Sequence, residues 1–193
     1  MCLIPYSNID LLYVLLEEVV TQRLEVPEPK VQDVRIINDN VGLLAIKEFN
    51  ERTLLEVQNA IDVLKGRAGD LEALVLDLRE NGGGLISAAF EVASMFLPKG
   101  KILSRIQSSD YGPPTIVRSI NRRADTSTSL LVVVDGKTAS ASEILAAALV
   151  DNNRAVCMGT KTVGKNMAQA IVRLSDGCGL VFTVRSFSSP LQR

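Results

Sequence analysis

Histidine is absent from the 193 residues of this chain, and its absence excludes several common kinds of active site. A Ser-His-Asp triad and a Cys-His pair both use an imidazole as the base, so neither can be built from these residues. The chain also has few cysteines, namely Cys2, Cys157 and Cys178. They have neither C-x-x-C nor paired disulfide spacing, and no histidine could complete a common zinc site with them. We therefore interpret the cysteines as small apolar residues.

Long basic runs are missing as well. The formal net charge is −1, and no run of basic residues is longer than Arg122-Arg123. Proteins that bind nucleic acid generally carry a clustered positive charge to neutralise phosphates. Nucleic acid is therefore not expected as a partner.

The first 20 residues contain an apolar stretch but lack the pattern of a targeting or membrane segment. Asp10, Glu17 and Glu18 interrupt the stretch, and no lysine or arginine precedes it. A signal peptide, a transit peptide and a membrane span are therefore not predicted.

Hydrophobic residues make up 47% of the chain and charged residues 22%, which suits a globular protein with one domain, or one domain with an appendage. Residues 9–24 carry apolar residues at helical spacing, and two prolines in "EVPEPK" follow them. We predict an N-terminal helical appendage and linker over 1–30 and a core over 31–193.

The core reads as an α/β fold. The apolar runs "ALVLDLR" and "LLVVVD" are typical of strands buried on both faces, and each leads through a turn of small residues into a helical pattern. In such folds the functional loops follow the carboxyl ends of the strands. Further expectations are strands at 31–37 and 41–46, a helix over 53–66 ending at Gly66, a long surface loop at 108–128, and a hairpin over 169–187 with its turn at 175–177.

The stretch from Gly159 to Lys165 has the spacing G-x-x-x-x-G-K of a phosphate-binding loop. Two features weaken that interpretation. Asn166 stands where Ser or Thr would bind Mg²⁺, and a strand-like pattern follows where the loop needs a helix N-terminus to hold the anion. Lys165 is better considered for another kind of chemistry.

Without histidine, a hydrolytic nucleophile needs another base, and lysine is the standard substitute. It serves only if its pKa falls from about 10.4 toward about 7–8, which requires removal from water. Lys165 lies between the apolar stretches "AVCMG" and "MAQAIV". It is the best candidate for a buried lysine, within reach of a nucleophile.

The best candidate nucleophile is Ser140, at the start of the helical pattern "EILAAALVDN". The helix dipole and the next backbone N–H would stabilise developing negative charge there. Ser140 and Glu143 also fit the capping box S-x-x-E, in which the serine only satisfies backbone donors. Similarly, the glycines of "ENGGG" suit a tight turn or an anion-binding loop. Spacing leaves both alternatives open.

Three stretches together resemble the carboxyl-terminal processing peptidases, the tail-specific protease family. They are "LVLDLRENGGGL", "VVVDGKTASASEILAAALVDNNRAV" and "GTKTVGKNMAQAIVRLSDGCGLVFTVRSF", in the family's order and spacing. The resemblance covers roughly residues 40–190 and implies a ClpP/crotonase-like core of βα units.

The resemblance also implies a catalytic set. "TASASE" places Ser140 where the family has its nucleophile, and Lys165, 25 positions later, where it has its general base. Gln169 falls where a glutamine orients that lysine. Gly84 and the N–H of Ala141 would form the oxyanion hole. The implied reaction is acyl transfer on a protein or peptide with an exposed C-terminus, and it needs no metal or cofactor.

The chain departs from the family pattern in several places. No PDZ module, which engages the substrate's C-terminus in relatives, is found in residues 1–30, and the chain stops before a G-[IV]-x-P-D motif, so a core truncated at its C-terminal end is one expectation. Asn166 replaces a common glycine, and Phe187 a common tyrosine. An inactive or truncated homologue acting as a binding module, and a crotonase-like acyl-CoA enzyme, are the alternatives. The resemblance implies the chloroplast thylakoid lumen or the bacterial periplasm as the compartment.

Overall fold

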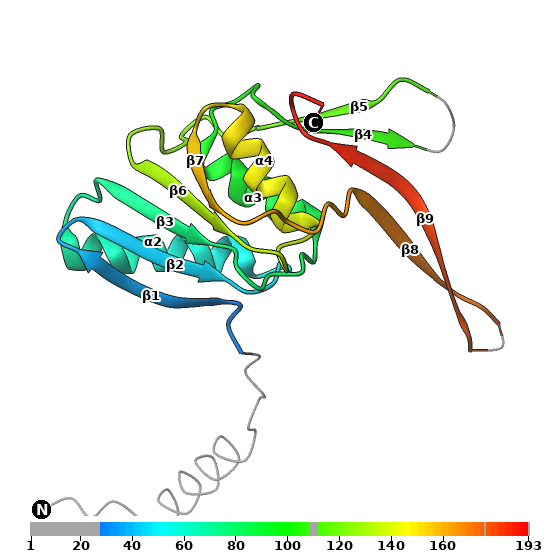
Figure 1. The fold of residues 1–193 in the computed structure, drawn as a ribbon, viewed down its shortest axis with the longest axis horizontal. Helices are drawn as coiled ribbons and strands as arrows, with labels where there is room; N and C mark the ends of the chain where they lie inside the picture. Colours follow the sequence, from blue (N-terminus) through cyan, green and yellow to red (C-terminus); the bar gives the residue numbers. More distant parts are fainter. Residues whose placement is uncertain (1–27, 109–111, 176, 193) are drawn as a thin grey trace, which may run out of the picture.

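The computed structural model describes residues 28–108, 112–175 and 177–192, drawn in colour in Figure 1. The helix predicted over 9–24 lies outside these residues. The described elements, in chain order, are β1 (Val31–Asn38), β2 (Val41–Ile46), α2 (Thr53–Ala68), β3 (Ala73–Asp77), α3 (Ile86–Phe96), β4 (Ile102–Ser108), β5 (Thr115–Arg118), β6 (Ser129–Val134), α4 (Ala141–Asp151), β7 (Ala155–Gly159), β8 (Met167–Arg173) and β9 (Gly179–Ser188).

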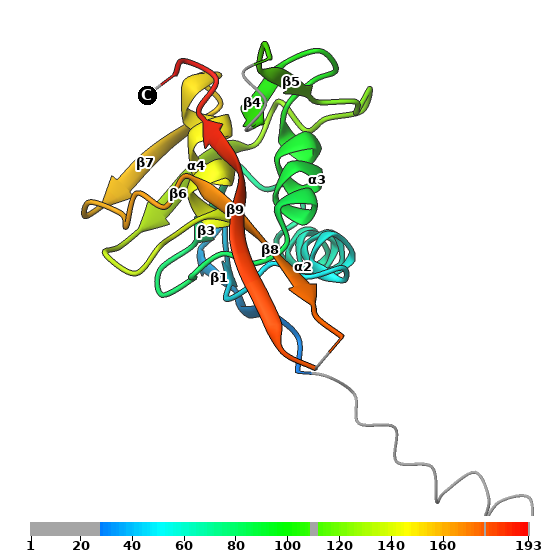
Figure 2. The same ribbon diagram turned by 90° about the vertical axis from the view of Figure 1, so that its right-hand side faces the viewer.

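A five-stranded sheet with the order β1-β2-β3-β6-β7 forms the centre of the fold. Strands β2, β3, β6 and β7 run parallel, and β1 is antiparallel to β2. Leu44, Leu76 and Val132 are paired across the middle strands, and each is fully buried. Figure 2 shows α2, α3 and α4 on one side of this sheet. The predicted α/β core is therefore confirmed.

Helix α2 shows how the apolar pattern places a helix on the sheet. Its buried residues include Val57, Ile61 and Leu64, at spacings of four and three, which form one apolar stripe. The prediction that it ends at Gly66 was wrong. The helix continues to Ala68 and stops at Gly69, whose φ of 75° is the left-handed conformation that glycine tolerates.

A second sheet, with the order β5-β4-β9-β8, is antiparallel throughout. It contains the predicted C-terminal hairpin of β8 and β9, which extends away from the five-stranded sheet in Figure 1. The prediction of a long surface loop over 108–128 was wrong, because this segment contains β5, which pairs with β4. The β-branched run Thr115-Ile116-Val117 suits that short edge strand. None of the described helices is long and apolar enough to cross a membrane.

Candidate active site

Ser140 lies at a sharp turn between β6 and α4. Because β3 and β6 are parallel neighbours, the loops that follow them meet at the same edge of the sheet. The Ser140 backbone has φ 56° and ψ −116°, a combination that L-residues rarely adopt. The buried Thr138 holds this turn by donating from Oγ1 to the Leu78 carbonyl at 2.9 Å. Strained residues of this kind cluster at functional sites.

The glycine loop after β3 lies directly against this turn. Gly83 and Gly84 have φ values of 109° and 125°. A Cβ on Gly83 would stand 2.8 Å from Ser140 Cβ, and one on Gly84 would collide with the Phe49 backbone. Phe49 N–H donates to the Gly83 carbonyl at 2.9 Å, and its carbonyl accepts from Leu85 N–H at 2.7 Å. Only glycine permits this approach.

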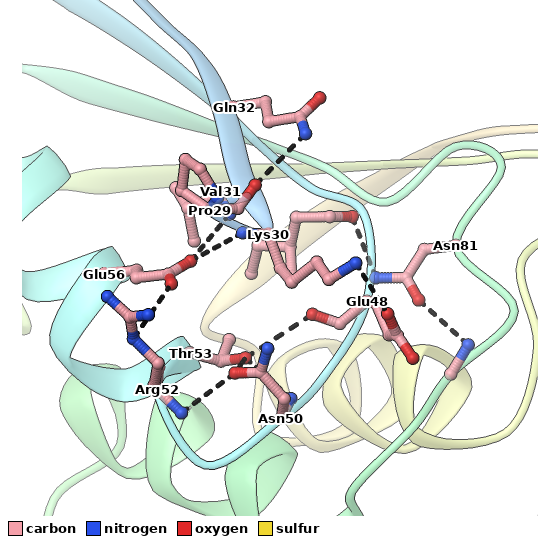
Figure 3. Close-up of polar contacts among 12 residues, drawn as sticks. Pro29, Lys30, Val31, Gln32, Glu48, Asn50, Arg52, Thr53, Glu56 and Asn81 are labelled. Atoms are coloured by element: carbon pink, nitrogen blue, oxygen red, sulfur yellow. Dashed lines mark hydrogen bonds and ion pairs between the residues drawn. The ribbon is translucent and has the colours of Figure 1, made fainter. Parts of the chain in front are cut away.

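Asn81 connects the glycine loop to its surroundings. Its side chain is fully buried; Nδ2 donates to the Ile46 carbonyl at 2.8 Å, and Oδ1 accepts from Gly83 N–H at 2.9 Å. Figure 3 shows the amide reaching between the two segments. Its backbone carbonyl accepts from Ala139 N–H at 3.0 Å and Ser142 Oγ at 3.2 Å. Hydrogen bonds of Asn81 therefore connect β2, the glycine loop and the Ser140 turn.

The backbone N–H groups around Ser140 differ in their partners and in their exposure, since Ala141 is fully buried whereas Gly84 is exposed. The N–H of Gly83 donates to Asn81, and the N–H of Ser140 donates to Glu143 Oε2 at 2.7 Å. Within the described residues, the N–H groups of Gly84 and Ala141 have no protein acceptor. A Cβ on Gly83 would stand 3.1 Å from Ala141 N, so the glycine loop comes close to the start of α4.

Lys165 belongs to the segment that connects β7 to β8. Val163 N–H donates to the Thr138 carbonyl at 3.1 Å, and the Asn166 carbonyl accepts from Phe187 N–H at 2.7 Å. The residues after Lys165 enter β8, which begins at Met167. A phosphate-binding loop requires a helix there, so the structure excludes that interpretation.

Hydrogen bonds to the Glu143 carboxylate hold this segment against the start of α4. Its Oε2 accepts from Ser140 N–H at 2.7 Å and from Lys165 N–H at 2.9 Å. Its Oε1 accepts from Thr162 Oγ1 and Gly164 N–H, both at 2.6 Å. Ser140 and Glu143 have the capping-box arrangement expected from the sequence, and the carboxylate makes three further contacts beyond it.

Ser140 and Lys165 line one cavity of about 330 Å³. Its apolar wall includes Leu103 and Ile144, and residues just before β8 and at the end of β9 line another part of it. The full lining is Leu103, Ser104, Ser140, Glu143, Ile144, Ala147, Gly164, Lys165, Asn166, Phe187, Ser188 and Ser189. Helix α4 and the second sheet thus border the space beside the predicted nucleophile.

The prediction that Lys165 is buried was wrong, because its side chain is exposed. The apolar stretches on either side of it in sequence form β7 and β8, which belong to different sheets and leave the connecting segment at the surface. Gln169 lies on β8 opposite Thr183, is exposed, and is not among the residues that line the cavity.

Two carboxylates stabilise the loops around the site. Asp77, at the end of β3, is buried and pairs with Arg79 at 2.6 Å. Burial raises the pKa of Asp77, but hydrogen bonds and charge from Arg79 outweigh it and lower that pKa. Asp135 joins the two loops, since its Oδ1 accepts from the N–H of Glu80 at 3.1 Å and of Lys137 at 3.0 Å. Burial raises the pKa of Asp135 and these bonds lower it, with a net decrease.

Sequence reasoning missed Asn81, Thr162 and the wider role of Glu143. Asn81 directly precedes the glycines, and a polar residue at that point was an available signal. Thr162 had no such signal, because its partner is 19 positions away in sequence. Among the described residues, no three Cys, Asp or Glu side chains converge in a way that could hold a metal ion.

The fold is an α/β core in which the glycine loop and the Ser140 turn lie together at one edge of the sheet, and comparison with known proteins gives its family. Residues 40–193 match the model of peptidase family S41. The chain therefore belongs to that family, as the resemblance at "TASASE" predicted.

Several relatives agree with this assignment. The chain is 37% identical over 151 residues to a carboxyl-terminal-processing protease of Synechocystis sp., and 40% identical over 150 residues to the chloroplastic carboxyl-terminal-processing peptidase 2 of Arabidopsis thaliana. These alignments cover 78% of this chain but only 34% and 28% of those proteins. A solved photosystem II D1 C-terminal processing protease superposes with a TM-score of 0.70 at 35% identity, over 84% of this chain and 42% of the other. The chain thus spans about a third of the length of these curated relatives.

Proposed function

We propose that this chain is the catalytic core of a serine endopeptidase that cleaves protein substrates near their C-terminus by acyl transfer. One observation carries the proposal: Ser140 and Lys165, 25 positions apart in sequence, line the same cavity. Their backbone N–H groups also donate to the same oxygen of Glu143. Membership of peptidase family S41 supports the reaction class.

In the proposed first step, the neutral amine of Lys165 accepts the Ser140 hydroxyl proton as Oγ attacks the substrate carbonyl carbon. The N–H groups of Gly84 and Ala141 receive the oxyanion. Removal of one such donor typically lowers the rate by about 10²–10³. Collapse breaks the C–N bond, and the lysine ammonium protonates the leaving amine. Water then hydrolyses the acyl-serine ester by the same proton transfers and restores the Ser140 hydroxyl.

The exposed Lys165 side chain has a consequence for this mechanism. A lysine accepts a proton only when it is neutral, and exclusion of water favours the neutral form. A substrate chain lying over the cavity would exclude water from Lys165. Lys165 would therefore act as the base only when substrate covers it. Gln169, proposed to orient the amine, would act in that bound state.

The cavity indicates which substrates would fit. Its apolar wall includes Leu103, Ile144, Ala147 and Phe187, which favours a small apolar side chain next to the scissile bond. An unstructured, apolar C-terminal segment is the proposed substrate class. The chloroplast, named for the Arabidopsis relative, is a candidate compartment. The family match does not favour the crotonase-like alternative.

The experiment incubates the purified chain with an unstructured peptide ending in small apolar residues. Ser140→Ala and Lys165→Ala should abolish cleavage. Ser142→Ala, whose Oγ donates to the Asn81 carbonyl, and Lys161→Ala, another exposed lysine of the same segment, are the matched controls that retain it.

The outcomes distinguish the proposed dyad from the alternatives. Full activity of Lys165→Ala at neutral pH would rule out the dyad. No cleavage by any form, with the chain folded, would favour the inactive homologue.

A further inference from the structure

The carboxylate of Glu143 is saturated with hydrogen bonds from two separate segments. Four donors reach it at 2.6 to 2.9 Å: Ser140 N–H, Thr162 Oγ1–H, Gly164 N–H and Lys165 N–H. A capping glutamate needs only the first of these. The other three come from the segment that carries the proposed base.

These contacts set the separation of the two proposed catalytic residues. Both Ser140 N–H and Lys165 N–H donate to Oε2, so their nitrogens can be no further apart than the sum of two hydrogen bonds of 2.7 and 2.9 Å. Gly164 and Lys165 are exposed on the surface. Packing therefore contributes little to holding this part of the segment, and the carboxylate is its main side-chain anchor.

The same contacts also affect the oxyanion site. The Ser140 N–H points to Glu143 and cannot turn toward a substrate, whereas the neighbouring Ala141 N–H has no protein acceptor in the described residues. Glu143 thereby occupies the Ser140 N–H, while the adjacent Ala141 is fully buried.

We propose that Glu143 is a positioning residue that holds the Lys165 segment against the Ser140 turn, with Thr162 as its side-chain partner. The proposal rests on the proposed function for its catalytic meaning. Both carboxylate oxygens accept, so the charged form is required. A glutamine would turn an NH₂ donor toward two of the four donors, and those contacts would be lost.

The first test uses steady-state kinetics on Glu143→Gln and Thr162→Val. Thr162→Val removes one donor to the carboxylate and leaves the Ser140–Glu143 contact in place. We expect kcat to fall by about 10- to 100-fold for Glu143→Gln, because small misplacements of reacting groups cost rates of this order. For Thr162→Val we expect a smaller fall in kcat than for Glu143→Gln. KM should change less than about threefold in both variants.

The matched control is Glu56→Gln. Glu56 also lies in the first turn of a helix, and its Oε2 accepts two backbone N–H groups, from Lys30 at 2.7 Å and Val31 at 3.0 Å (Figure 3). Because a glutamine can place its carbonyl oxygen at the Oε2 position and keep both contacts, Glu56→Gln should leave kcat unchanged. Unchanged kcat in Glu143→Gln, or an equal loss in Glu56→Gln, would show that Glu143 is only a helix cap.

A second measurement does not depend on turnover. Amide hydrogen exchange of residues 160–166 should speed up at least tenfold in Glu143→Gln and stay unchanged in Glu56→Gln. Faster exchange with an inactive parent would support the positioning role while contradicting the proposed function. Unchanged exchange would overturn the positioning role whether or not the parent cleaves peptides.

Discussion

Asn81 Oδ1 accepts the backbone N–H of Gly83 at 2.9 Å, at the point where the glycine loop meets the Ser140 turn. The same amide donates to the Ile46 carbonyl at 2.8 Å. Since the side chain is fully buried, water cannot replace either bond. The position of the glycine loop therefore depends on this side chain as well as on the backbone of Phe49.

Asn81→Ala should destabilise the fold and also impair the proposed reaction. Loss of two buried partners costs about 1–3 kcal/mol of unfolding free energy, measurable by urea denaturation. The freed loop should lower kcat by about tenfold or more, because the adjacent Gly84 N–H loses its fixed orientation.

The control for that prediction is Asn152→Ala. Asn152 Nδ2 donates to the carbonyls of Ile102 and Ala148, both at 2.8 Å, at the far end of α4. It should reduce stability comparably without changing kcat. Equal kcat in the parent and Asn81→Ala, at a temperature where both are folded, would contradict the role given to Asn81.

Gly84→Ala should be far more damaging than Gly100→Ala, although both glycines have positive φ. At Gly100, with φ 94°, no described residue has an atom within 4 Å of a new Cβ, so only backbone strain of about 1 kcal/mol is expected. At Gly84 the Cβ would also meet the Phe49 backbone, and a loss of about 3 kcal/mol or more is expected. Denaturant unfolding of both variants measures the difference. Similar losses would mean that the loop is free to move away from Phe49.

Asp125 should stabilise the fold in a pH-dependent way. Burial raises the pKa of Asp125, but hydrogen bonds from Thr128 and Ser127 outweigh it and lower that pKa from 3.8 to about 2. A group with a lowered folded pKa contributes stability above its unfolded pKa, and that contribution is lost as pH falls through the folded value. The contribution is therefore complete above about pH 4 and disappears toward pH 2.

Asp125→Ala measures this contribution. It should lower the unfolding free energy by about 1–2 kcal/mol at pH 7, and the gap to the parent should close between about pH 4 and pH 2. Thr128→Val, which removes the donor 2.8 Å from Asp125 Oδ2, should lose part of the same effect. A gap that stays constant with pH would show that Asp125 contributes through packing alone.

Local patterns in the sequence were sufficient for much of the fold. The apolar runs at 73–79 and 130–135 predicted β3 and β6, and the three- and four-residue spacing at 53–66 predicted most of α2. These features depend on near neighbours in the chain, where periodicity is direct information. The end of α2 was misplaced, and the short strand β5 was missed because its residues were predicted as part of a loop. Gly66 is tolerated inside a helix, and β5 forms only because β4 is there to pair with it.

The candidate site also has features that the sequence predicted and features that only the structure shows. The sequence by itself determined that no histidine could act, that Ser140 begins a helix, and which family the motifs resemble. Only the tertiary structure decided that Lys165 is exposed and that Glu143 contacts both Ser140 and the Lys165 segment. Burial and hydrogen bonding between distant segments depend on how β7, β8 and α4 are arranged in space. That arrangement cannot be inferred from the spacing of residues along the chain.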